Sequence, residues 1–278
     1  MVIKELTTAE QLLHTTIRIE TKTPVGDYTG TGFFFSFHND LKTSKHIPVI
    51  ITNKHVVKDA DTGKLRFSLK DTAGNPIPGK FSDLKIDNFE ARWIKHPEND
   101  IDLCALPIAN IHREISKSEH KLYYVPLQKT NIPTQKELDG EYSRIEEIIV
   151  IGYPNVKWDS CINIPITRKG ITATPLQTNF VNTPQFLIDA AIYGGSSGSP
   201  VFVFNQGSYY LPNGGLYAGT RTSLVGVVCA FALYTAEGEI QIVDIPAAKT
   251  PIVHTRIPNN LGVAIHAKKI LDFESLIT

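Results

Sequence analysis

Three residues of this chain have side chains of the types that together hydrolyse acyl bonds: a serine, a histidine and an aspartate. Ser197 lies in FLIDAAIYGGSSGSPVFVF, at residues 186–204, between two apolar runs. Gly194, Gly195 and Gly198 surround it, and glycine adopts backbone angles that other residues resist. Such a turn presents a hydroxyl and leaves backbone N–H groups free, as a nucleophile with an oxyanion hole requires. A glycine-serine hairpin without chemistry fits the stretch equally well, so a base and an acid must be found elsewhere.

The candidate base is His55, in ITNKHVV. It follows the apolar residues VIIT at the point where a strand leaves the core, so its ring could face a cleft. The other eight histidines have polar or helical surroundings, or precede a proline as His96 does. Since a structural role is the default for one such histidine, the prediction for His55 depends on the acid.

Two aspartates compete for the role of the acid. Asp100, in HPENDIDLCAL, stands at the start of an apolar run that would carry it inward. A buried carboxylate is costly without a partner, and a histidine N–H is one such partner. Asp102 lies two residues further, on the same side of an extended strand. The pattern of residues leaves open which of the two is buried.

The elements that must position these residues are mostly strands. Short runs rich in Val, Ile, Thr and Phe, separated by Gly, Pro, Asn and Asp, fill two stretches of the chain with a polar segment between them. We predict an N-terminal helix at 1–14, a first β domain at 15–108, a connection at 109–146, a second β domain at 147–260 and a C-terminal helix at 261–278.

Composition indicates which partners and which cellular compartment to expect. The 28 basic and 28 acidic side chains cancel, so no overall field favours nucleic acid or an anionic membrane. Cys104, Cys161 and Cys229 are few, odd in number and far apart, which favours reduced thiols over disulfides or a zinc site. The first residues lack the apolar core of a signal peptide, and no run is long enough for a membrane span. We therefore expect a cytoplasmic protein without metal or cofactor.

Together these segments resemble the trypsin-like, chymotrypsin-fold serine proteases, most closely their bacterial HtrA-like and glutamyl-endopeptidase-like branches. The resemblance rests on GTGFFF at 30–35, TNKHVV around His55, NDIDLCAL around Asp100, VIGYP at 150–154 and DAAIYGGSSGSPVF around Ser197. It spans roughly residues 15–267 and keeps the order His, Asp, Ser. It implies an all-β fold of two antiparallel six-stranded β-barrels and a protein or peptide substrate.

The resemblance also assigns roles. It implies Ser197 as nucleophile, His55 as general base and Asp100 as the orienting acid, because Asp102 falls where the family has a small apolar residue. The backbone N–H groups of Gly195 and Ser197 would form the oxyanion hole. Asp189 matches a structural aspartate ahead of the turn.

The primary substrate pocket is predicted to be apolar. Ala191 stands where members specific for basic residues carry aspartate, and Val228 stands where glutamate-specific members carry histidine. With Ile192, Cys229 and Phe231 these residues would form an apolar pocket whose depth Phe231 limits. The strand from Cys229 to Phe231 would pair with the substrate backbone by β-augmentation.

Two departures from the family bear on control. Ser196 stands where digestive members have an acid that pairs with a newly cut N-terminus, and neither that start sequence nor a PDZ-like domain is present. We therefore expect regulation by a partner protein.

A protease-like binding or scaffolding module, or a protease held inactive until a partner binds, stays open as the alternative. An α/β-hydrolase elbow with Ser196 as nucleophile fits poorly, because SPVFVF continues as a strand where that elbow opens a helix.

Overall fold

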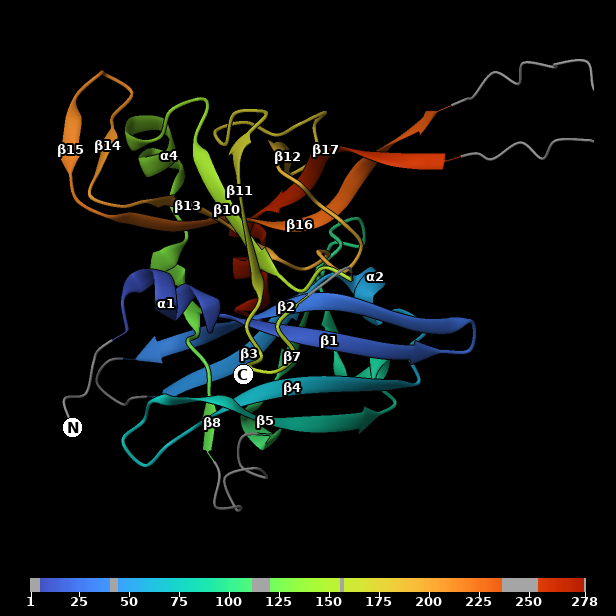
Figure 1. The fold of residues 1–278 in the computed structure, drawn as a ribbon. Helices are drawn as coiled ribbons and strands as arrows, with labels where there is room; N and C mark the ends of the chain where they lie inside the picture. Colours follow the sequence, from blue (N-terminus) through green and yellow to red (C-terminus); the bar gives the residue numbers. More distant parts are fainter. Residues whose placement is uncertain (1–5, 41–44, 112–120, 156–157, 237–254, 278) are drawn as a thin grey trace, which may run out of the picture.

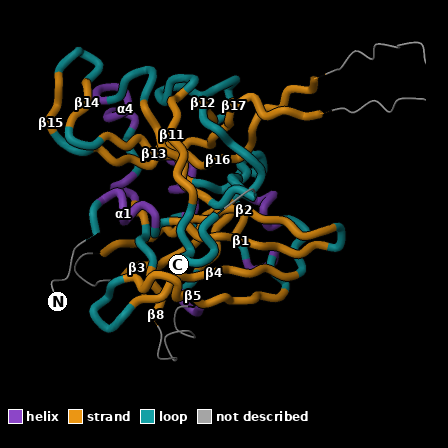
Figure 2. Tube along the Cα trace, in the orientation of Figure 1, coloured by secondary structure: helices purple, strands orange, loops and turns teal. Residues whose placement is uncertain are grey.

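The computed structural model describes residues 6–40, 45–111, 121–155, 158–236 and 255–277. Within these ranges the chain is mostly β-strand, and two β domains are stacked on each other (Figure 1). The first half of the chain, blue to green in Figure 1, builds the lower domain, and the second half builds the upper one. Figure 2 shows that the helices are short and lie outside the sheets. None of the helices within these ranges has the length and apolar character needed to span a membrane.

The first domain is one nine-stranded sheet. Seven of its strands follow the order β5-β4-β1-β2-β3-β7-β6, while β8 pairs with β4 and β9 pairs with β2. Its strands are β1 Thr16–Thr23, β2 Gly26–Asp40, β3 Lys45–Thr52, β4 Thr62–Lys70, β5 Pro76–Asp87, β6 Ile94–Lys95, β7 Cys104–Pro107, β8 Lys121–Tyr123 and β9 Leu127–Gln128. Burial alternates along β1 and β4: Ile17 and Ile19 of β1 are fully buried, whereas Arg18 and Glu20 lie on the outer face.

The second domain is a closed barrel of six strands in the order β10-β11-β12-β17-β16-β13. Its strands are β10 Glu147–Gly152, β11 Ile166–Thr172, β12 Gln185–Asp189, β13 Pro200–Asn205, β16 Arg221–Ala236 and β17 Thr255–His266. A separate hairpin, β14 Ser208–Tyr210 and β15 Leu216–Ala218, projects from it (Figure 1). The predicted all-β fold of chymotrypsin type is confirmed, although the pairings among described residues leave the first sheet open between β5 and β6.

Helical residues at 109–111 and six helical segments with both ends described accompany the strands. The six segments are α1 Thr8–Leu13, α2 Lys54–Val57, η1 Glu90–Arg92, η2 Lys129–Asn131, α4 Gln135–Glu141 and η3 Ala267–Phe273. The predicted boundary at residue 261 is wrong, because β17 continues to His266 and closes the barrel between β12 and β16. The C-terminal helical segment, a 3-10 helix, therefore begins at Ala267.

A shared apolar cluster fixes the two domains relative to each other. It combines Phe35 and Ile51 of the first sheet with Phe202 and Ile265 of the barrel, and Phe273 of η3 also packs into it. All five side chains are at most 1% exposed. Because protein interiors are close-packed, this cluster holds the loops at the junction of the domains in one arrangement.

Candidate active site

His55 is presented by the one-turn helix α2, directly after β3. The neighbouring Val56 and Val57 are buried and anchor the turn, whereas the side chain of His55 remains 45% exposed. Asn53, at the start of the turn, donates a hydrogen bond from Nδ2 to the Asp102 carbonyl at 2.8 Å. The turn that carries the histidine is thus tied to the segment that carries its acid.

The acid that pairs with His55 is Asp102, so the prediction of Asp100 is wrong. His55 Nδ1 lies 2.6 Å from Asp102 Oδ2, and the His55 backbone N–H donates to Asp102 Oδ1 at 3.1 Å. Asp100 is exposed in a turn before β7 begins at Cys104. Ile101 and Leu103 are buried in the core, and the Leu103 N–H donates to the Ile101 carbonyl at 2.9 Å, which closes a tight turn around Asp102.

The sequence signal that favours Asp102 was the continuous apolar run that directly follows it. Leu103, Cys104, Ala105 and Leu106 form an uninterrupted buried run directly after Asp102. The strand therefore starts later than expected, and Asp100 lies outside the extended geometry that would put both acids on one side.

The turn that carries Ser197 is held from both domains. Thr31 of β2 donates its backbone N–H to the Ser197 carbonyl at 2.9 Å, and Gly198 donates to the Val228 carbonyl at 2.8 Å. Gly198 has a φ of +84°, and a Cβ there would lie 1.9 Å from the Thr31 carbonyl oxygen. Only glycine fits this position.

Thr31 is a positioning residue that the sequence pattern did not reveal. Its buried Oγ1 donates to the Gly195 carbonyl at 2.9 Å and accepts from the Tyr153 N–H at 2.9 Å. The Thr31 carbonyl in turn accepts from Thr52 Oγ1 at 2.7 Å. One hydroxyl of the first domain thereby holds both the turn of Ser197 and the residue that follows β10 in the second domain.

The predicted oxyanion donors are free. The Gly194 carbonyl accepts from the Asn155 N–H at 2.8 Å, and the Ser196 carbonyl accepts from the Ser199 N–H at 3.0 Å. In a trans peptide the N–H points opposite to the carbonyl of the same unit, so the N–H groups of Gly195 and Ser197 point away from these bonds. Among the hydrogen bonds of the described residues, neither N–H has an acceptor.

His55, Ser197 and Gly195 line one cavity of about 570 Å³ between the two domains. Its wall also includes Lys58, Asp59, Asn155 and the hairpin that joins β1 to β2. Among the hydrogen bonds of the described residues, none joins the Ser197 hydroxyl to the His55 ring. Bonds of this kind are often long in unliganded sites and tighten when substrate binds.

The predicted primary pocket is not open at all of its residues. Ile192 and Val228 are 2% and 1% exposed and belong to the core of the barrel, with Phe231 packed against it. Gly262 of β17 lets the strand pass against Ile192, where a Cβ would lie 2.9 Å from Ile192 Cγ1. Ile192 and Val228 therefore face a closed core, while Ala191 and Cys229 remain partly exposed.

Two cysteines near the acid are poor nucleophiles. Burial, and then the charge of Asp102, raise the pKa of the Cys229 thiol to about 12. The same two causes hold the pKa of the Cys104 thiol well above its usual value. Both thiols therefore stay protonated near neutral pH, and neither residue lines the cavity of Ser197.

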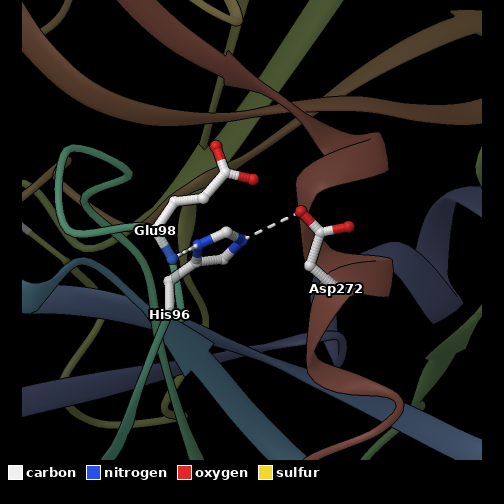
Figure 3. A group of neighbouring side chains, drawn as sticks. All are labelled: His96, Glu98 and Asp272. Carbon is white, nitrogen blue, oxygen red and sulfur yellow. Dashed lines mark hydrogen bonds and ion pairs between the residues drawn. The ribbon is translucent and has the colours of Figure 1, made fainter.

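A group of metal-ligand residue types, His96, Glu98 and Asp272, lies beside this site (Figure 3). His96 Nδ1 accepts the Glu98 N–H at 3.1 Å, so the ring donates from Nε2 to the Lys269 carbonyl at 3.1 Å and to Asp272 at 3.3 Å. Lys269 Nζ lies 2.5 Å from Glu98 Oε1 and 3.0 Å from Asp272 Oδ2. The ring has no free lone pair and a cation already bridges the acids, so the group clamps η3 onto the turn before Asp102 instead of offering a metal site.

This chain is similar to known proteins in sequence pattern and in fold. Residues 30–209 match the trypsin-like peptidase domain family. A variant of the HtrA-type protease AlgW with a tripeptide is similar in structure, with a TM-score of 0.50 and 16% identity over 96% of this chain and 61% of the other. A serine endoprotease from Yersinia pestis gives 0.47 and 15% over 99% and 68%, and the active form of Rv3671c protease from M. tuberculosis gives 0.44 and 14% over 96% and 82%.

The chain spans about three fifths of the length of the AlgW chains it matches. No curated protein sequence matches it. The family match nevertheless covers well over half of the chain, from β2 to β14, and includes His55, Asp102 and Ser197. The chain belongs to the trypsin-like peptidase domain family, a family of serine endopeptidases.

Proposed function

We propose that this protein hydrolyses peptide bonds through a triad of Ser197, His55 and Asp102 and a covalent acyl-enzyme. The observation that carries the proposal is the 2.6 Å contact between His55 Nδ1 and Asp102 Oδ2 at the wall of the cavity that also contains Ser197. A base oriented by an acid beside a serine in a glycine turn is the constellation that activates a hydroxyl.

In the acylation step, His55 Nε2 takes the proton of Ser197 as its Oγ attacks the carbonyl carbon of the substrate. Asp102 accepts from Nδ1 and keeps the lone pair of the neutral ring on Nε2, facing the serine. The oxygen of the tetrahedral intermediate accepts hydrogen bonds from the N–H groups of Gly195 and Ser197, and each such donor is worth roughly 10²–10³ in rate.

His55 then gives the proton to the leaving amine, and the peptide bond breaks. Water enters, His55 takes one of its protons, and the resulting attack on the ester releases the acid and regenerates Ser197. Every proton stays between His55, the serine and the reactants, so the sequence of steps closes with one water consumed.

The test is covalent labelling of the purified chain with a fluorophosphonate probe, followed by mass spectrometry of the modified peptide. We expect labelling at Ser197 that is lost in Ser197→Ala and in His55→Ala. Labelling at Ser196 would favour the hydrolase-elbow interpretation. Absence of labelling would favour a binding module or a closed state, and both outcomes contradict the proposal.

We also propose that a partner protein controls this activity, and this expectation is independent of the triad. The bonds from Asn155 to Gly194 and from Thr31 to Gly195 hold the turn open without any other chain. We therefore expect the isolated chain to react with the probe, and a regulator to act on access of substrates to the cavity. Labelling that requires an added cell extract would instead place control at the turn itself.

A further inference from the structure

A second cavity continues the first one across the outer face of the first sheet. The two have volumes of about 570 and 590 Å³. Their common wall consists of Arg18, Thr21, Asp27, Tyr28 and Thr29. A peptide that leaves the cavity of Ser197 past the β1–β2 hairpin therefore enters the second one directly.

The strand register shows how this second cavity extends. Thr29 of β2 pairs with Glu20 of β1, Glu20 pairs with Lys64 of β4, and Lys64 pairs with Lys85 of β5. Directly opposed residues in antiparallel strands point to the same face. Thr29 also hydrogen-bonds to Asn155, whose N–H holds Gly194. The row thus runs from the nucleophile turn outward over β2, β1, β4 and β5, which lie in this order in Figure 1.

Positive charge dominates this outer cavity. Its wall contains four cations and two carboxylates: Arg18, Lys22, Lys64 and Lys85 against Glu20 and Asp27. Glu20 is shared between two of the cations, at 2.9 Å from Arg18 Nε and 2.5 Å from Lys64 Nζ. The inner cavity, by contrast, has equal numbers of the two signs, with Lys58 and Asp59 beside Arg18 and Asp27.

Neighbouring acids do not cancel this charge. Asp83, on the same face of β5, is bound by Arg66 through two contacts of 2.6 Å. Asp87 lies at the end of β5 and is not part of the cavity wall. Arg18 Nη1 is buried without a hydrogen-bond partner among the described residues, so part of its donor capacity is unused where the cavities meet.

The cavities lie on the leaving-group side of the catalytic serine. In the proposed function the acyl part of the substrate pairs with the edge of β16 beyond Val228, where pairing with β13 has ended. Neither cavity is lined by a residue of β16. The chain that follows the cut bond must therefore leave past Gly194, Asn155 and the β1–β2 hairpin.

We propose that the residues after the cut bond cross both cavities and that the outer one selects acidic side chains. Because the inference assigns a substrate class to the same site, it rests on the proposed function. Three strand spacings of about 4.8 Å separate Thr29 from Lys85, or about 14 Å, which an extended chain covers in about four residues. Selection for glutamate or aspartate therefore falls on the positions beyond the first few after the cut.

Binding of product-like peptides tests this without requiring catalysis. The Ser197→Ala chain is titrated by fluorescence anisotropy with two labelled peptides, in which a run of alanines is followed by an equally long run of either glutamates or lysines. Each peptide has the free N-terminus of a released leaving group. We expect the acidic peptide to bind at least about tenfold more tightly at low salt, with the difference shrinking at about 0.15 M salt, as exposed charges are screened.

Charge reversal locates the effect. Lys22→Glu combined with Lys85→Glu should weaken binding of the acidic peptide about 3- to 10-fold, as expected for two exposed ion pairs. Lys136→Glu, an exposed lysine on α4 of the other domain, is the matched control and should leave the affinity unchanged. Equal binding of both peptides, no detectable binding of the acidic one at low salt, or an equal effect of the control would overturn the inference.

Failure of the catalytic proposal and failure of the proposed selection for acidic residues give different results. Neither Lys22 nor Lys85 touches the catalytic residues, so fluorophosphonate labelling of the Lys22→Glu, Lys85→Glu chain reports on the triad alone. Labelling of Ser197 without charge-selective binding would refute the outer cavity as a substrate site. Charge-selective binding without labelling would refute the catalytic proposal and retain the cavity as a site for acidic peptides.

Discussion

Replacing Asp102 by asparagine removes one acceptor from the pair with His55 while keeping the shape of the side chain. Both carboxylate oxygens of Asp102 accept: Oδ1 from the His55 backbone N–H at 3.1 Å and Oδ2 from Nδ1 at 2.6 Å. Asparagine has one acceptor oxygen, and the fixed backbone donor claims it. The amide group then faces Nδ1, and the ring must put its proton on Nε2, where it blocks proton transfer from Ser197.

The expected loss of activity is that of a triad whose histidine carries its proton on Nε2 instead of Nδ1. It amounts to roughly 10⁴-fold in kcat, the size known for the same change in another protease with this triad. At about 1.36 kcal/mol per factor of ten, this is about 5 kcal/mol of transition-state stabilisation. The assay is hydrolysis of a peptide found by library screening, together with the rate of fluorophosphonate labelling.

Asp100→Asn is the matched control, because it changes the same group two residues away in an exposed turn. We expect it to stay within about twofold of the unmodified chain, and surface substitutions of this kind rarely change stability by more than about 0.5 kcal/mol. Thermal melting of both variants shows whether either one is misfolded. An Asp102→Asn chain that keeps a tenth of its activity, or an Asp100→Asn chain that loses as much, would refute the assignment of the acid.

Three further predictions concern positioning, pH and metals. Thr31→Val removes the donor to the Gly195 carbonyl and the acceptor of the Tyr153 N–H. This change should lower the free energy of unfolding by about 2–4 kcal/mol and slow fluorophosphonate labelling at least tenfold. Thr31→Ser should keep the labelling rate, and a Thr31→Val chain that labels normally would contradict this role. Burial lowers the pKa of His266 from 6.5 to about 4. Between these pH values the unfolded chain binds a proton that the folded chain does not. The free energy of unfolding should therefore fall by up to about 3 kcal/mol as the pH falls from 6.5 to 4. Urea unfolding of His266→Gln should show a correspondingly shallower pH dependence, and an unchanged slope would exclude His266 as its source. Added Zn²⁺ should leave the melting temperature unchanged, because His96 has no lone pair to offer; a zinc-dependent rise that His96→Gln abolishes would show that the clamp opens to bind metal.

Short-range patterns in the sequence determined the fold class and two of the three reactive residues. Alternating apolar residues predict strands, and the glycines at 194, 195 and 198 demand a turn whatever surrounds them. His55 and Ser197 stand at the ends of such elements, so their exposure follows from local structure, and both line the same cavity.

Only the tertiary structure decided which aspartate serves His55. The choice depends on where β7 starts: because it begins at Cys104, Asp100 lies in an exposed turn and Asp102 beside the ring. Strand ends are set by pairing with distant strands, here β7 with β3, and not by the residues of the strand alone. The contact of Thr31 with the nucleophile turn likewise joins residues 164 positions apart, and only the packing of two domains brings them together.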